Sequence, residues 1–82
     1  MQWIDELAGV FEAEPLSQDE IELLLNVARD VAHGVERKIT PLASFLLGMS
    51  VERRMESGAA RAVALEAAVA DLRATFPVEG SA

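Results

Sequence analysis

The chain has 82 residues, of which 51% are apolar, enough for one small domain and too few for two. Its fourteen acidic and seven basic residues give a net charge of −7, which disfavours nucleic acid as a partner. The absence of cysteine excludes disulfides and cysteine-ligated zinc. No apolar run is long enough for a signal peptide or a membrane span, so we expect a soluble cytoplasmic domain over residues 1–77.

Residue types and spacing predict an all-α fold. Ala, Leu, Glu and Arg dominate, and apolar residues recur at intervals of three and four. A first helix is predicted over about Gln2–Ala13, where Pro15 closes it. Its apolar face would consist of Trp3, Leu7, Val10 and Phe11.

The start of a second helix is marked by Ser17 and Glu20, which have the spacing of a capping box before an apolar run. This helix should continue to His33, with Gly34 as the residue that ends it. Its apolar residues cover about 200° of arc at 100° per residue, which predicts a central helix with neighbours on several sides.

A third helix is predicted to begin at Thr40 as the N-cap, followed by Pro41. Gly48 would permit close approach of a neighbouring backbone. The main core stripe of this helix is expected to be Leu42, Phe45, Leu46 and Met49.

A break at Ser57-Gly58 is preferred to one long helix, with Ser57 capping a fourth helix that continues to Phe76. Pro77 would stop this helix, and the tail 78–82 is expected to be disordered. These elements predict a four-helix up-down bundle with the second helix most central. The core line of the fourth helix would be Leu65, Val69, Leu72 and Phe76.

Charge is unevenly distributed along the chain. Residues 1–28 contain seven carboxylates and no Lys or Arg, whereas residues 29–82 contain seven of each sign. The acidic part could dock a basic partner, or it could simply be the solvated face of two helices.

A polar stripe is predicted on the second helix, opposite its apolar arc. His33, the only histidine, would lie near Asp30 and the negative end of the helix dipole, which suits either a switch or general acid, or an ordinary C-terminal cap. One histidine without cysteine gives no expected metal site, and no nucleophile elbow or nucleotide-binding loop is present, so we expect no cofactor and favour a non-enzymatic role. The stripe contains Glu22, Asn26, Arg29, Asp30, His33 and Arg37.

Two segments, ARDVAHGVER at residues 28–37 and PLASFLLG at residues 41–48, resemble the signature of a small bacterial family of unknown function. Members of that family are about this long and occur alone or appended to molybdenum-cofactor guanylyltransferase domains. The chain departs from the expected signature at residues 38–40. The resemblance implies a protein partner of that kind and directs attention to a surface formed by Asn26, Arg29, Asp30, His33, Arg37 and Pro41.

Three functions therefore compete. The first is an accessory interaction module that acts beside a molybdenum-cofactor enzyme. The second is a small-anion binder or weak acid-base site that uses His33, Asp30 and Arg37, with His33 and Arg37 near the start of the third helix. The third is a homodimer whose seam is the alanine-rich fourth helix.

Overall fold

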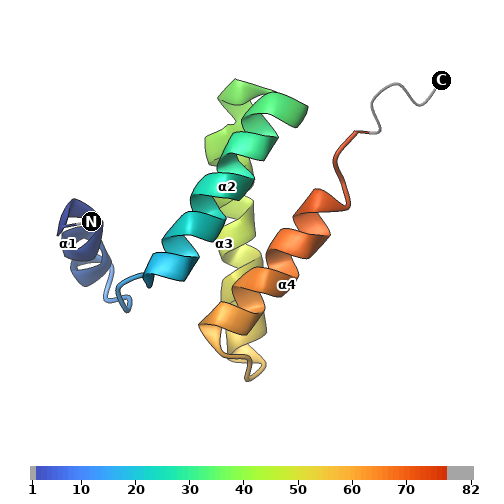
Figure 1. The fold of residues 1–82 in the computed structure, drawn as a ribbon. Helices are drawn as coiled ribbons and strands as arrows, with labels where there is room; N and C mark the ends of the chain where they lie inside the picture. The colour runs from blue at the N-terminus through green and yellow to red at the C-terminus, as the bar shows by residue number, and fades with distance from the viewer. Residues whose placement is uncertain (1, 78–82) are drawn as a thin grey trace.

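A computed structural model describes residues 2–77 and confirms the all-α prediction of four helices (Figure 1). The tail 78–82, for which disorder was predicted, lies outside the described residues. No helix within residues 2–77 has both the length and the apolar character needed to cross a bilayer. The elements are α1 (Gln2–Val10), α2 (Gln18–Gly34), the 3-10 turn η1 (Arg37–Ile39), α3 (Thr40–Glu56) and α4 (Arg61–Arg73).

Helix α1 ends three residues earlier than predicted, at Val10. Glu12 adopts a left-handed backbone with φ of 55°. Its N–H donates to the Gly9 carbonyl at 3.1 Å, and the Ala13 N–H donates to the Ala8 carbonyl at 2.8 Å. These are the two bonds of a Schellman motif, so the helix is closed before Pro15 is reached.

The predicted start of α2 is confirmed. The Ser17 N–H donates to Glu20 Oε1 at 2.8 Å, and the Glu20 N–H donates to Ser17 Oγ at 3.1 Å, which completes the capping box. The predicted end is wrong by one residue, because Gly34 is still helical and Val35 is the cap. The helix end does not use a left-handed glycine, because the Val35 N–H still bonds to the Val31 carbonyl and Gly34 keeps a negative φ.

Helix α3 starts at Thr40, whereas Thr40 was predicted to be its cap. Ile39 holds the cap position without a side-chain hydrogen bond, because the preceding turn η1 leads directly into the helix. The Thr40 Oγ1 atom is buried without a hydrogen-bond partner, so its hydroxyl caps nothing. Pro41 lies in the first turn, as expected.

The break between α3 and α4 is confirmed at Ser57-Gly58, where Gly58 has a φ of 111°. Ser57 does not cap α4 as predicted, because its N–H and hydroxyl both bond to carbonyls in the last turn of α3. Ala60 precedes the first residue of α4, and the helix ends at Arg73, three residues before Phe76.

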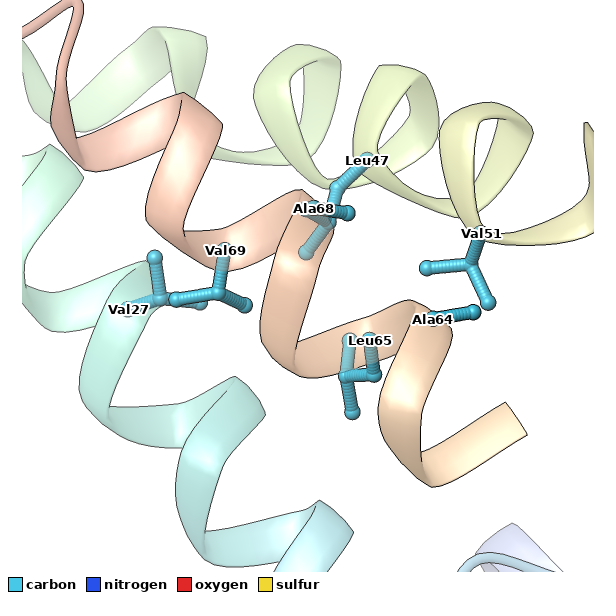
Figure 2. Close-up of a cluster of buried hydrophobic side chains, with 7 residues drawn as sticks. All are labelled: Val27, Leu47, Val51, Ala64, Leu65, Ala68 and Val69. Carbon is cyan, nitrogen blue, oxygen red and sulfur yellow. The ribbon is translucent and has the colours of Figure 1, made fainter. Parts of the chain in front are cut away.

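The core lies around α4, which packs against both α2 and α3 (Figure 2). Val27 of α2 faces Val69 on one side of α4, while Leu47 and Val51 of α3 approach the other side. The prediction that α2 is the most central helix is therefore wrong, because α4 contributes half of the buried apolar residues. Its contribution is Ala64, Leu65, Ala68 and Val69.

The core stripe predicted for α3 faces the wrong way. All four of its side chains are more than half exposed, whereas Leu47 and Val51 carry the contact with α4 at 5% and 9% exposure. The buried residues are one turn apart and lie on the opposite side of the helix from the predicted stripe. The exposed stripe consists of Leu42, Phe45, Leu46 and Met49.

Helix α1 lies apart from the three packed helices (Figure 1). Its predicted apolar face therefore has little cover, with Trp3, Val10 and Phe11 at 67%, 73% and 70% exposure. Ile4 of α1 lines a small apolar cavity together with Ile21 and Leu25 of α2. The packed core is thus built from α2, α3 and α4.

Candidate functional site: an apolar groove beside an ion pair

An ion pair between Glu20 of α2 and Arg61 of α4 joins the first turns of these two helices. Arg61 Nη2 lies 2.7 Å from Glu20 Oε1, and Arg61 Nε lies 2.9 Å from Glu20 Oε2. The same guanidinium donates to the carbonyl oxygens of Glu14 and Pro15, each at 2.7 Å. One side chain thereby joins the start of α4 to the start of α2 and to the loop that leads from α1.

Both charges of this pair are shielded from water. The side chains of Glu20 and Arg61 are 8% and 24% exposed. The hydrogen bonds from Arg61 outweigh the cost of desolvation and lower the pKa of Glu20 to about 2, while the carboxylate raises the pKa of Arg61. Glu20 was counted among the acidic surface residues, but it is a buried structural anion.

An apolar groove runs between α2 and α3, and the ion pair lies at one end of it. Its volume is about 460 Å³. Leu24, Leu25 and Ala28 line one wall, and Leu47 and Val51 lie on the other side. Leu65 of α4 lies at the bottom, so every packed helix contributes to the groove.

Gly48 lies on the α3 wall of this groove. The close approach of a neighbouring backbone that was predicted for Gly48 does not occur, because a Cβ atom built there would meet nothing within 4 Å. Its neighbours on the groove side are Ser44 and Val51. The missing side chain leaves a gap in the wall that a helix from another molecule could occupy.

A wider acidic hollow of about 850 Å³ adjoins the groove. Both cavities are lined by Glu20 and Arg61, whose charges compensate each other. The hollow also contains Glu12, Glu14 and Glu52, so three further carboxylates stand at this end of the groove. The combined site offers apolar contact along its length and negative charge at one end.

The polar stripe predicted on α2 is only partly assembled. Arg29 Nη2 donates to Asn26 Oδ1 at 3.1 Å, one turn away on the same helix. Asp30 forms its ion pair with Arg73 of α4, and this contact, more than the nearby Arg29 and His33, lowers the pKa of Asp30. Asp30 therefore serves the packing of α2 on α4.

The other three predicted site residues are all exposed. His33 is in the last turn of α2, Arg37 is in η1, and Pro41 is in the first turn of α3. The Thr40 N–H bonds to the Arg37 carbonyl, so this donor at the start of α3 is already paired within the chain. Neither the groove nor the acidic hollow is lined by Asp30, His33, Arg37 or Pro41.

Sequence reasoning missed both Arg61 and the groove. Arg61 is 41 positions from Glu20, and no local pattern links the two. Gly48 lies on the groove wall, but a glycine within a helical pattern only lowers helix propensity and does not by itself indicate a groove. Among residues 2–77, no three His, Asp or Glu side chains are grouped in a way that could hold a metal ion.

Comparison with known families identifies the chain. The model of a family described as a domain of unknown function, DUF6457, matches residues 1–80, and the chain belongs to this family. No curated protein matches the sequence. No solved structure matches it either.

Proposed function

We propose that this member of the DUF6457 family is an accessory interaction module that binds an amphipathic helix of a partner protein in the groove between α2 and α3. The observation that carries the proposal is the open apolar groove over Gly48, bordered at one end by Glu12, Glu14 and Glu52. An apolar groove between two helices is a common way to hold the apolar face of a third helix.

The charge around the groove defines the chemistry of the partner. A helix that lays its apolar residues on Leu25 and Ala28 would bring one of its ends to the three carboxylates. Lys or Arg at that end would complement them and would speed association at low salt. The expected ligand is therefore a helix with one apolar face and a basic end.

The resemblance noted above suggests the first partner to test, a molybdenum-cofactor guanylyltransferase from the same genome. The measurement is an amide NMR titration of labelled protein with that enzyme. We expect shifts concentrated on Leu25, Ala28, Ser44 and Gly48, weakening as salt is raised. Shifts confined to the polar stripe would move the partner surface to that stripe and contradict the groove.

A synthetic helix tests the groove independently of the partner's identity. An amphipathic Leu/Lys peptide should bind, and a peptide with the same apolar face and Glu in place of its terminal Lys should bind more weakly. Gly48→Phe should block both ligands, because the new ring would fill the open wall. Gly48→Ala is the matched control and should leave binding largely intact.

Retained binding by Gly48→Phe would rule out the groove. Binding of the peptide without binding of the guanylyltransferase would keep the groove and reject that enzyme as the partner. The helical circular-dichroism signal checks the fold in each variant, and no neighbouring atom lies within 4 Å of a Cβ at position 48.

A further inference from the structure

The exposed stripe on α3 is a second apolar surface, separate from the groove. Leu42, Phe45, Leu46 and Met49 are 64%, 70%, 63% and 54% exposed, and none of them lines the groove. Four large apolar side chains at spacings of three and four form a continuous face of the kind that packs against another helix.

The spacing of the stripe is symmetric about its own midpoint. When the order of its four positions is reversed, Leu42 exchanges with Met49, and Phe45 exchanges with Leu46. A two-fold axis through that midpoint would therefore set each stripe against an antiparallel copy of itself. Such self-complementarity is what an isologous interface requires.

Charge favours the antiparallel arrangement. At one end of the stripe, Glu36, Arg37 and Lys38 sum to +1. At the other end, Glu52, Arg53 and Glu56 sum to −1, while Arg54 is already paired with Asp71 of α4. An antiparallel pair places opposite charges together at both ends, whereas a parallel pair would place like charges together.

Two copies that each carry a net charge of −7 repel each other, so a dimer interface is favoured where the local charge is small. The excess acidity lies in residues 1–28, whereas the segment Thr40–Glu56 contains two acidic and two basic residues. A surface on α3 therefore keeps self-association away from the acidic part of the chain, where two copies would repel each other most strongly.

From these relationships we infer that the protein forms an antiparallel homodimer in which the α3 stripe of one copy packs on the α3 stripe of a second. Leu42 lies opposite Met49 of the second copy, and Phe45 lies opposite Leu46. The stripe spans roughly 10 Å along the helix axis at about 1.5 Å per residue, so the interface is small and association should be weak, with a dissociation constant on the order of 10–100 µM.

This surface differs from the seam expected from sequence, the alanine-rich fourth helix, two of whose alanines are buried. Ala64 and Ala68 are 1% and 2% exposed because they pack in the core of their own chain. They are not available to a second copy.

Sedimentation equilibrium from about 1 µM to about 1 mM brackets a dissociation constant of this size. We expect the mass to double across that range. Phe45→Glu should weaken association by more than about tenfold, because it places a charge at the centre of the interface. Val63→Glu makes the same charge change at an exposed position on α4 and should leave association unchanged.

The lack of cysteine allows the register to be tested by crosslinking. The double variant Leu42→Cys/Met49→Cys should form a covalent dimer on mild oxidation, while either single variant should not. Within one chain the two positions are roughly 10 Å apart along the helix, beyond the reach of about 7 Å between Cα atoms that a disulfide needs.

A mass that stays monomeric throughout would overturn the inference and leave the stripe to a different protein. Crosslinking of Leu42→Cys alone would overturn the antiparallel register. The test of the dimer is independent of the test of the groove. Gly48→Phe should leave the sedimentation result unchanged, and Phe45→Glu should leave peptide binding unchanged.

Discussion

Leu46 and Leu47 are adjacent in the chain, yet Leu46 is 63% exposed and Leu47 is 5% exposed. Figure 2 shows Leu47 directed toward α4, whereas most of the Leu46 side chain is in contact with water. This pair of identical residues provides an internal comparison of core and surface.

Leu47→Ala should lower the free energy of unfolding by about 2–4 kcal/mol, because it leaves a cavity between α3 and α4. Leu46→Ala removes the same atoms from a solvated position and should cost less than about 1 kcal/mol. Urea unfolding at low micromolar concentration would measure both values for the monomer. Equal losses would contradict the burial described for α3.

The contact between Glu20 and Arg61 predicts a second stability effect. Arg61→Met should cost about 3 kcal/mol, because it leaves the Glu20 carboxylate buried without its partner and releases the Glu14 and Pro15 carbonyls. Arg53→Met, at an exposed position on α3, is the control and should change stability by less than about 0.5 kcal/mol. Chemical denaturation of both variants is the measurement, and a loss below about 1 kcal/mol for Arg61→Met would mean that the ion pair contributes little.

Acid should lower the free energy of unfolding by protonating Glu20, which breaks its ion pair with Arg61. The pKa of Glu20 is about 2 in the folded chain against an ordinary value of 4.5, so its stabilising contribution is complete above pH 4.5 and is lost as the pH falls through 2. This shift corresponds to roughly 3 kcal/mol. Because the carboxylate binds its proton more readily in the unfolded chain, unfolding takes up protons in that range.

The measurement for this prediction is the free energy of unfolding between pH 6 and pH 2, where Glu20→Gln should show a shallower decline than the unaltered protein. Glu22→Gln removes an exposed carboxylate from the same helix and is the control. Asp30, whose pKa is also lowered by its partner Arg73, adds a decline common to all three proteins. Identical slopes for Glu20→Gln and the unaltered protein would exclude Glu20 as the acid-sensitive group.

Local chemistry allowed several elements to be predicted from sequence. The capping box of Ser17 and Glu20 and the chain reversal at Gly58 each depend on residues within a few positions of one another. The buried line through Leu65 and Val69 was also predicted correctly, because the remaining positions on that side of α4 are small.

The face of α3 could not be chosen in the same way. Two sets of apolar residues have helical spacing, and the set that contains Phe45 and Met49 is the bulkier. Periodicity shows that a helix has an apolar face, but the neighbouring helix decides which of two such faces is buried. Here the neighbour is α4, where the small side chains of Ala64 and Ala68 let Leu47 and Val51 come close. The candidate groove was hidden for the same reason, since its walls come from helices brought together by packing.

The backbone of Glu12 bears on how this sequence can vary. With a φ of 55°, the residue has a conformation that glycine and asparagine adopt readily and that β-branched residues resist. Substitution at this position is therefore constrained by backbone shape more than by side-chain chemistry, even though the side chain is exposed. Among related sequences, Gly or Asn aligned here would signal the same chain reversal after α1, whereas Val or Ile would signal a different path from α1 into α2.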